Sequence, residues 1–470
     1  MLAASTLLWA ATSSVAHAAS ESSNDGGAGE LGTVVLLVVM IGVAYVLAHS
    51  VVERLQRRFL VVSGAEYLLL GVLLGLSSGI AGAGKENLLG LFPVIALAAG
   101  WVGLLRGTDF DFASLQRLDP ATWRIVFLHH LLPGVAVGVG AYYFFTLAGP
   151  LLTVEKISEA GMVTSVNPFV DRETGILAFR DAALAAAALA CFAATDSAEP
   201  FDLLARRYEV GGRIAPLLRN GTRLGDIVVI LAFGLIFCVF HEEAPGARAY
   251  SPSLWAWVTV LLGGALGFLF SLFLAGDESD NSRFLALVGI IAFASGGAYF
   301  LKISPLAVNL SRGFVLVNFA RGGQLLHTTL ESTERPMALV LMIFAGALWD
   351  IPPKEQIWPT VAALVGFLIL RTSGKWLASL IAGWGTTLRK DLFRGLLAHG
   401  DVTLAMAVSF RLVYEGSPPV DIAYSVVLGS IVLNDLIAPR LLRGLLVDEG
   451  GIQKELRGDD PRTSIEGTTR

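Results

Sequence analysis

The sequence is dominated by apolar runs of about 20 residues that are separated by short polar connections. A run of that length, folded as a helix, is long enough to cross the hydrocarbon core of a bilayer. Hydrophobic residues make up 54% of the 470 residues and charged residues only 16%, and the mean hydropathy is +0.66. A soluble protein of this size needs more charge to cover its surface, so the sequence predicts an all-α polytopic membrane protein.

Thirteen runs qualify as transmembrane helices, which gives a transmembrane domain over residues 31–445. Two of the runs, the fifth and the twelfth, are interrupted by polar residues. The expected spans are 31–50, 62–81, 88–106, 123–148, 176–207, 221–240, 253–275, 283–301, 304–320, 336–350, 357–383, 391–415 and 420–442.

The basic residues of the connections predict the orientation, because cytoplasmic loops are enriched in arginine and lysine. Alternate connections carry most of them: Arg54, Arg57 and Arg58, then Arg106, Arg117 and Arg124, then Arg206, Arg207, Arg213, Arg219 and Arg223, and later Arg321, Arg335, Arg389, Lys390, Arg394, Arg440 and Arg443. With an odd number of spans, this places the N-terminus outside and the C-terminus in the cytoplasm. We therefore predict a multi-pass protein of the cell membrane.

The two ends of the chain have a different composition from the spans. Residues 1–30 form a signal-like segment with a polar leader, to be cleaved after Ala18 or kept as an uncleaved hydrophobic end. Residues 446–470 are polar and without apolar period, which predicts a disordered cytoplasmic tail. The net charge of −5 argues against a nucleic-acid partner.

The fifth span is interrupted by Thr195-Asp196-Ser197-Ala198-Glu199-Pro200. Pro200 disfavours helix in the residue before it, and the Thr, Asp and Ser oxygens can cap a new helix start. Unwound backbone persists inside a membrane only where protein or water satisfies it, so the pattern predicts a broken helix that lines an ion site. The alternative is a helix that ends near Ala194, with Asp196 at the cytoplasmic interface.

Asp226 is the acidic residue of the sixth span, with Thr222 one turn earlier on the same face. A charge at the centre of a membrane helix costs about 2.5–3.5 kcal/mol, so such residues usually line an ion or proton path. A buried carboxylate that holds either a proton or a monovalent cation exchanges one for the other by competition. We predict that Asp226 is this site. The alternative is a first-turn Asp favoured by the helix N-terminus.

The eleventh and twelfth spans carry further charges. Arg371 is expected to be buried and to need a carboxylate or carbonyl partner, whereas Lys375 is expected to extend towards the cytoplasm. The segment Ala398-His399-Gly400-Asp401-Val402-Thr403 resembles the fifth-span interruption, with Asp401 as the expected N-cap of a second half-helix. The two interrupted spans run in opposite directions, as an inverted pair of broken helices requires.

Other polar features are assigned no chemistry. His129 and His130 are adjacent and point about 100° apart on a helix, so they cannot chelate one metal together. Asn434-Asp435 is expected to mark an interfacial helix end near Pro439. No catalytic constellation is recognisable, so we expect neither an enzyme nor a cofactor.

Five segments resemble the monovalent cation:proton antiporter superfamily, in its sodium/proton exchanger branch. They are the Gly103–Leu118 element that ends the third span, Thr195-Asp196, Asp226, Arg371 with Gly374, and Gly400-Asp401, and the similarity extends over about residues 60–445. The resemblance implies an inverted-repeat antiporter fold of about 13 helices with two broken crossing helices. It also implies a homodimer in which spans four to six and eleven to thirteen move as a core bundle against a dimerisation scaffold.

The resemblance further implies that Asp226 carries Na⁺, K⁺ or H⁺, with Thr195 and Asp196 in the binding site and Glu199, Thr222, Arg371 and Asp401 in support. The sequence departs from the family pattern at Gly225, where the family has Asn or Asp, at Gly221, where some members have Glu, and at the displaced Pro200. Arg371 is then left to pair with Asp226, Asp196 or Glu199.

The resulting expectation is a secondary active transporter that exchanges Na⁺ or K⁺ for H⁺, with membrane lipid as its surroundings. The alternative is a non-transporting or regulatory membrane protein that keeps the antiporter scaffold with a degenerate ion site. Gly225 and Gly221 favour that alternative.

Overall fold

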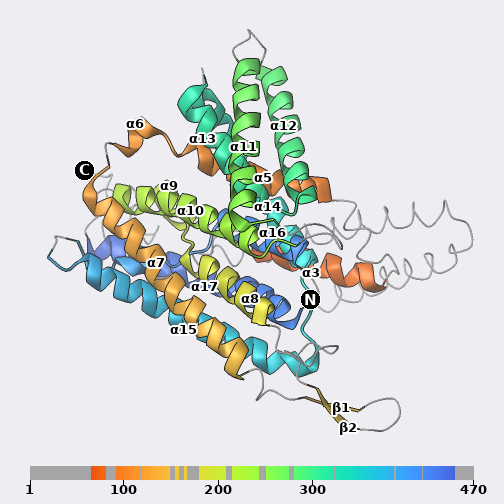
Figure 1. The fold of residues 1–470 in the computed structure, drawn as a ribbon. Coiled ribbons are helices and arrows are strands. Elements are labelled where there is room, and N and C mark those ends of the chain that lie inside the picture. Colours follow the sequence, from red (N-terminus) through yellow and green to blue (C-terminus); the bar gives the residue numbers. More distant parts are fainter. Residues whose placement is uncertain are drawn as a thin grey trace, which may run out of the picture.

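A computed structural model describes residues 65–80, 92–116, 118–148, 154–157, 163–166, 179–207, 214–242, 250–274, 280–320, 323–385, 388–414 and 417–449 (Figure 1). The predicted first span, 31–50, the leader over 1–30 and residues 450–470 lie outside these ranges. The domain boundaries expected at the two ends therefore stay predictions, as does the count of thirteen.

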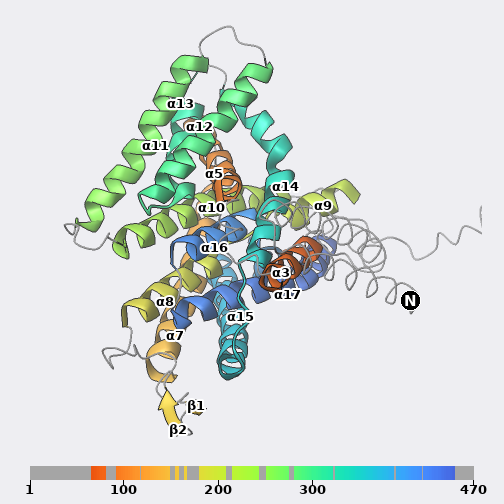
Figure 2. The same ribbon diagram turned by 90° about the vertical axis from the view of Figure 1, so that its right-hand side faces the viewer.

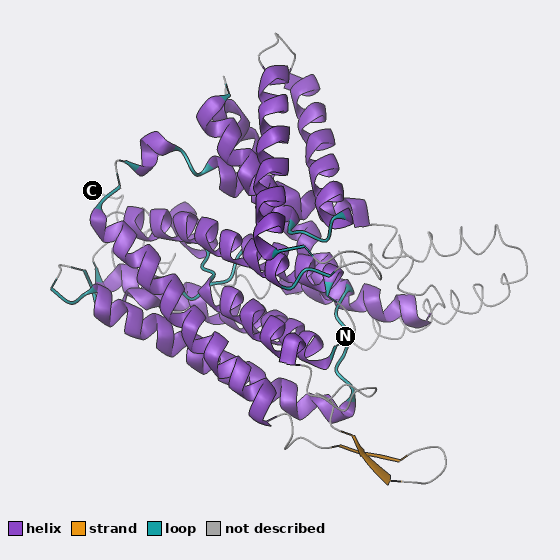
Figure 3. Cartoon of the chain, in the orientation of Figure 1, coloured by secondary structure: helices purple, strands orange, loops and turns teal. Residues whose placement is uncertain are grey.

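Helices occupy each predicted span from the second to the thirteenth. They are α3 (Ala65–Ile80), α5 (Phe92–Thr108), α7 (Pro120–Tyr143) continued by a π-helical turn η1 (Phe144–Ala148), α8 (Phe179–Ala194), α9 (Glu199–Arg207), α10 (Ile214–Val239), α11 (Pro252–Leu274), α12 (Asp280–Phe300), α13 (Pro305–Phe319), α14 (Gly323–Ala347), α15 (Lys354–Ala382), α16 (Asp401–Val413) and α17 (Pro418–Asp448). A short helix α6 (Phe112–Leu115) and a 3₁₀ turn η3 (Leu392–Gly395) lie in the connections. Figure 3 shows how fully helices account for the described chain.

One set of helices, here called the scaffold group, contains α3, α5, α11, α12, α13 and α14. Helix α5 packs along α13, α14 and α12, and α11 and α3 extend the group on either side (Figure 2). Helices α5 and α13 approach closely because Gly103 and Gly107 face α13, where a Cβ at Gly103 would lie 2.5 Å from the carbonyl oxygen of Leu306. Small residues at such spacing are typical of close helix contacts in membranes.

The remaining spans form a second set, here called the crossing group: α7, α8, α9, α10, α15, α16 and α17. Helix α7 packs between α8 and α15, and α17 covers α8 and α15. These are the fourth to sixth and eleventh to thirteenth spans, the bundle implied by the family resemblance. Helix α10 contacts α11 and α13, and α16 contacts α5 and α14, so these two helices face the scaffold group.

Several predicted boundaries were wrong. Helix α10 begins at Ile214 rather than 221, α14 begins at Gly323 rather than 336, and α17 continues to Asp448, into the segment predicted as tail. Asn434 and Asp435 therefore lie inside α17 and are buried, not at an interfacial helix end. The connection between η1 and α8 contains an antiparallel hairpin of β1 (Val154–Ile157) and β2 (Val163–Val166).

Six helices of the described chain are long and apolar enough to cross a membrane: those over Pro120–Leu147, Arg180–Asp202, Ile214–Val239, Pro252–Leu272, Gln356–Ala382 and Pro418–Asp448. Their outward faces are apolar. On α7, for example, Phe127, Leu131, Val135 and Val139 recur every four residues and are about half exposed or more. A continuous exposed apolar stripe suits lipid rather than water. The chain is a multi-pass membrane protein.

Candidate functional site

The two interrupted spans meet at their breaks. The first break separates α8 from α9 over residues 195–198, and the second separates η3 from α16 over 396–400. Ser197 Oγ accepts a hydrogen bond of 3.2 Å from the backbone N–H of Glu199 and so begins α9. Gly400 lies against Ser197: a Cβ at position 400 would be 2.8 Å from Ser197 Oγ. The broken-helix reading of the fifth span therefore holds, and Pro200 occupies the first turn of α9, where proline is well tolerated.

A chain of hydroxyl and imidazole groups joins the breaks. Thr403 Oγ donates a 2.8 Å hydrogen bond to Thr195 Oγ, which itself donates to the carbonyl oxygen of Phe192. The His399 ring contacts Thr195 Oγ through Nδ1 at 3.1 Å and Ser430 Oγ through Nε2 at 3.1 Å. All of these side chains are buried. The unwound segments are thus satisfied by protein, as backbone within a membrane requires.

Arg371 fastens both breaks from α15. Its guanidinium donates to the carbonyl oxygens of Ala193 at 3.2 Å and Thr195 at 2.9 Å in the first break, and of Leu397 at 2.7 Å in the second. The side chain is buried. The prediction that Arg371 is buried is right, and its donors meet carbonyl groups, one of the two kinds of partner expected. Its hydrogen bonds do not go to the carboxylates of Asp226, Asp196 or Glu199. A Glu at position 221 is therefore not needed to satisfy the donors of this base.

Asp196 is paired with Lys375, and both side chains are fully buried. The second carboxylate oxygen of Asp196 lies 3.5 Å from His130 Nε2. Lys375 was expected to extend towards the cytoplasm, but its ion pair with the Asp196 carboxylate holds the side chain inside the bundle. Asp196 at an interface, the alternative prediction, is likewise excluded by its burial.

Asp226 lies deep within α10. Because the helix begins at Ile214, Asp226 is 12 residues from its start, about 18 Å along the axis. The first-turn alternative is therefore wrong. Asp226 Oδ2 lies 3.4 Å from Nε of Arg106, while Asp226 Oδ1 has no hydrogen-bond partner among the described residues.

Arg106 is at the centre of a group of carboxylates. Its Nη2 donates to Glu334 Oε1 at 2.7 Å and to the Asp401 carboxylate at 2.9 and 3.1 Å. Its Nη1 lies 3.5 Å from Asp109 Oδ2. Asp401 was expected to be an N-cap, but Gly400 holds that position and the Asp401 side chain makes no capping bond. The guanidinium draws the Asp401 carboxylate away from the helix end.

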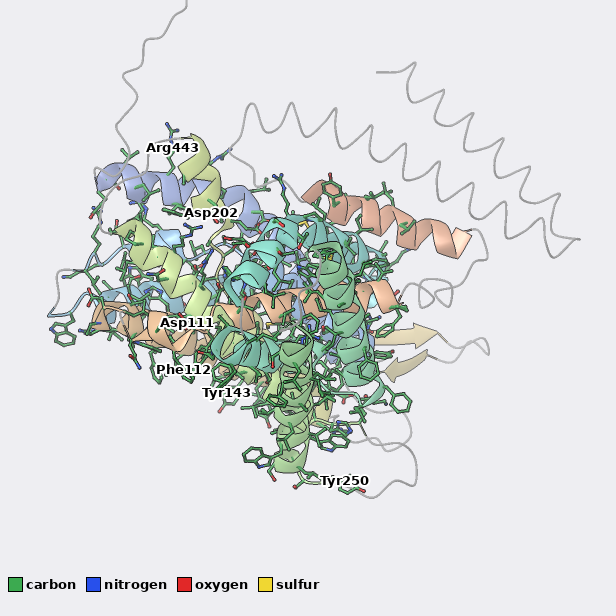
Figure 4. All side chains as sticks on the ribbon, turned by 90° about the horizontal axis from the view of Figure 1, so that it is seen from above. Asp111, Phe112, Tyr143, Asp202, Tyr250 and Arg443 are labelled. Carbon is green, nitrogen blue, oxygen red and sulfur yellow. The ribbon has the colours of Figure 1, made fainter. Side chains whose placement is uncertain are left out.

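Asp226, Glu334 and Asp401 line a small cavity of about 50 Å³. Two arginines and six acidic residues surround it: Arg106, Arg223, Glu199, Asp202, Asp226, Glu331, Glu334 and Asp401. The exposed fraction of the side chain rises from 5% for Asp226 to 40% for Asp202 and 44% for Glu331. Asp202, at the outer end, is labelled in Figure 4. Asp226 therefore lies at the closed end of an acidic funnel, which Thr222 and Ser197 also line.

A wider cavity of about 530 Å³ adjoins this funnel, since Arg223 lines both. Its polar lining includes Thr108, Asp109, Asp111 and His327; Asp111 is also labelled in Figure 4. Thr108 Oγ contacts His327 Nδ1 at 2.9 Å. The funnel and the wider cavity offer water a polar approach from one side of the molecule.

Aromatic rings fill the bundle on the other side of the buried carboxylate. They belong to α8, α10 and α16 and the residue after α16, they are all buried, and neighbouring centroids lie 5.0–6.2 Å apart: Phe192, Phe233, Phe237, Phe410 and Tyr414. The packed rings make this side of Asp226 apolar in the part of the chain that the structure describes. The structure has its acidic funnel open on one side and an apolar closure on the other.

Sequence reasoning missed Arg106, Glu334 and His130. Arg106 was counted as a loop base, and Glu334 lies before the predicted start of the tenth span. Thr195 and Asp196 lie in the first break, but they do not line the funnel and their side chains face other polar groups. Glu199, Thr222 and Asp401 do line it beside Asp226.

The departure at Gly225 has a steric cause. The imidazole of His130 occupies the space that a Cβ at position 225 would need, and the ring is fixed because His130 Nδ1 contacts the carbonyl oxygen of Val126 at 2.6 Å. The histidine ring fills the space beside the position at which the family that the sequence resembles has Asn or Asp.

Restoring the family residue with Gly225→Asn is therefore expected to destabilise the protein by about 1–3 kcal/mol, because overpacking a filled interior strains it. Thermal unfolding in detergent would measure this. The double variant Gly225→Asn with His130→Ala should recover part of the loss. Equal stability of the Gly225→Asn variant and the wild type would show that the ring moves aside without strain.

The fold and site define an α-helical membrane protein in which two interrupted helices cross inside a bundle, an architecture of secondary transporters. Among solved structures, it is similar to the sodium proton antiporter MjNhaP1 from Methanocaldococcus jannaschii at pH 8, with a TM-score of 0.56 and 15% sequence identity over 87% of this chain and 99% of that chain. An electron-microscopy structure of the same antiporter gives a TM-score of 0.55 and 14% identity over 88% and 97% of the two chains. No family model and no curated protein matches the sequence. The antiporter fold expected from the sequence is confirmed.

Proposed function

We propose that the protein is a secondary active transporter that exchanges a monovalent cation, Na⁺ or K⁺, for H⁺ through competition at Asp226. One observation carries the proposal: Asp226 is buried in the middle of α10, at the closed end of an acidic funnel and beside two interrupted, crossing helices. A carboxylate so placed is expensive in a membrane protein and usually serves an ion path. The likeness to a sodium proton antiporter supports the same conclusion.

The charge around the funnel favours a cation. Its lining has six carboxylates and two guanidinium groups, so it attracts positive ions and disfavours anions. A cavity of about 50 Å³ has room for a few water molecules or a partly hydrated monovalent cation. Both Na⁺ and K⁺ fit this description, and the backbone and carboxylate oxygens near the breaks suit hard monovalent cations in general.

In this mechanism Asp226 holds either the cation or the proton, never both. Thr195 and Asp196 support the site from the first break, Glu199, Thr222 and Asp401 flank Asp226 in the funnel, and Arg371 keeps the two breaks together. Movement of the crossing group against the scaffold group would close the funnel and open the aromatic side. No cofactor takes part, and the protein acts as a transporter rather than an enzyme.

The proposed setting is the cell membrane, with the N-terminus outside and the C-terminus in the cytoplasm. The funnel then opens towards the cytoplasm, because its lining residues Asp202 and Arg223 flank, in the sequence, the arginine-rich stretch 206–219, and arginine-rich stretches predict the cytoplasmic side. A homodimer embedded in lipid, as the family resemblance implies, completes the proposal.

A second candidate is a non-transporting membrane protein on the same scaffold. The observation that favours it is Arg106, because a resident guanidinium already lies 3.4 Å from Asp226 and neutralises part of the charge that a cation would otherwise balance. Such a protein would keep the fold and lose the exchange.

Reconstitution separates the two candidates. Purified protein in liposomes with an imposed pH gradient and an enclosed pH-sensitive dye should dissipate the gradient when Na⁺ or K⁺ is added, and choline should have no effect. A gradient of one pH unit supplies about 1.4 kcal/mol per cation moved, which is ample for a measurable signal. If no alkali cation changes the dye signal, exchange is excluded and the non-transporting candidate stands.

A further inference from the structure

Arg106 connects the two helix groups at the bottom of the funnel. It lies on α5, and Glu334 on α14, both in the scaffold group; Asp226 on α10 and Asp401 on α16 belong to the crossing group. One guanidinium thus contacts carboxylates of both groups. No other part of the proposed exchange mechanism uses this residue.

The contacts of the guanidinium are unequal. Nη2 makes short hydrogen bonds to Glu334 and Asp401, at 2.7 and 2.9 Å. Towards Asp226 there is only a charge contact, 3.4 Å from Nε to Oδ2, and neither Arg106 Nε nor Asp226 Oδ1 has a hydrogen-bond partner in the described part of the chain. Glu334 and Asp401 therefore hold the guanidinium beside Asp226, to which it makes no hydrogen bond.

A positive charge so close to a carboxylate weakens the binding of any other cation there, since the two charges repel at short range. Arg106 keeps its own charge under all physiological conditions. The weak contact with Asp226 leaves one carboxylate oxygen available to an incoming ion, while the firm contacts with Glu334 and Asp401 prevent the guanidinium from leaving the funnel.

We propose that Arg106 is a tethered internal competitor that sets the affinity of Asp226 for its monovalent cation. The inference rests on the proposed function, because Asp226 is taken as the cation site. It adds that the guanidinium of Arg106, and not the Asp226 carboxylate alone, sets the cation concentration at which the site fills. Arg106 acts on the cation through Asp226 and is a positioning residue.

Removing the charge with Arg106→Gln should lower the KM for Na⁺ or K⁺ in proteoliposomes about tenfold or more, because one neighbouring charge commonly changes the ion affinity of a carboxylate by that factor. The KM is measured at alkaline pH, where Asp226 is ionised in both proteins, because the same substitution also strengthens the binding of the competing proton. Arg106→Lys keeps the charge and should return the KM to within about threefold of the wild type. Lys302→Gln, which removes a lysine paired with Glu242 on the surface of the scaffold group, is the control and should leave the KM unchanged.

A binding measurement makes the inference independent of transport. The rise in melting temperature on addition of NaCl or KCl, relative to choline chloride, should be larger for Arg106→Gln than for the wild type. If Arg106→Gln folds poorly, the double variant Arg106→Gln with Glu334→Gln removes the base together with one of its partners and should show the same increase.

The outcomes are distinct. An unchanged KM with a lower turnover in Arg106→Gln, or an unchanged cation-dependent melting shift, would reduce Arg106 to a structural residue and overturn the inference. If the wild type transports nothing, the proposed function fails, and the melting shifts alone decide whether the guanidinium excludes cations from Asp226.

Discussion

Exchange of Na⁺ or K⁺ for H⁺ is expected to fall to background when Asp226 is replaced by Asn. The amide has nearly the shape of the carboxylate, but it can neither take up a proton nor balance the charge of a cation. Asp226 is one of the two buried carboxylates that line the funnel, with Asp401, and a neutral side chain there would remove the competition on which the proposed exchange depends. The measurement is cation-dependent collapse of a pH gradient in proteoliposomes.

The variant should still fold, since among the described residues Asp226 is paired only with Arg106, at 3.4 Å, and Arg106 keeps its shorter contacts with Glu334 and Asp401. Glu242→Gln is a matched control, because it removes an acidic group from an ion pair with Lys302 that lies outside the funnel, and it should keep wild-type exchange. Wild-type exchange by Asp226→Asn itself would eliminate Asp226 as the exchanging residue.

The transmembrane spans could be predicted from the sequence because their apolar runs are long and the breaks contain strong signals. Thr195 to Pro200 and Gly400-Asp401 combine hydroxyl, carboxylate, Gly and Pro residues that cannot continue an apolar helix without a partner. Each break is present in the structure. The bundle formed by the spans on either side also agrees with the family resemblance.

Boundaries and depth were harder to predict. The first turns of α10 contain Arg219, Asn220 and Arg223, so a hydropathy argument starts the helix at 221. Asp226 then falls close to the N-terminal end of the predicted helix. In the structure Arg219 lies 3.5 Å from Asp202, Asn220 and Arg223 line cavities, and the helix has already made three turns before Asp226. Hydropathy alone cannot distinguish polar residues that line a cavity inside a membrane protein from the polar residues of a loop.

Pairing could not be predicted because the partners are distant in sequence or belong to the backbone. Arg106 contacts Asp226, Glu334 and Asp401, and although Arg106 lies in the Gly103–Leu118 element, nothing in that element shows which distant carboxylates it meets. The partners of Arg371 are carbonyl oxygens, which every residue has, so no side-chain pattern can reveal them. The steric relation between Gly225 and His130 is equally invisible without coordinates.

Loss of the folded protein is expected for Arg371→Ala. Three carbonyl oxygens, of Ala193, Thr195 and Leu397, would lose the donor that satisfies them in a buried region. An unsatisfied buried acceptor costs about 1–3 kcal/mol, so three of them approach the net stability of about 5–15 kcal/mol that is typical of a folded protein. The yield of monodisperse protein and its melting temperature in detergent would both fall sharply.

Arg371→Lys separates charge from geometry. The ammonium group keeps the positive charge but is a single point, whereas the guanidinium presents donors in a fork that reaches both breaks at once. We therefore expect the lysine variant to remain well below the wild type in melting temperature.

Arg312→Ala is the matched control for Arg371→Ala. Arg312 is also fully buried, but it donates to the carbonyl oxygen of Ile290 within the scaffold group, so its loss should cost less. If Arg371→Lys is as stable as the wild type, charge alone suffices and the two breaks do not depend on the fork. Because the crossing of the two breaks is what gives Asp226 its surroundings, that result would also require another explanation for how the site is held together.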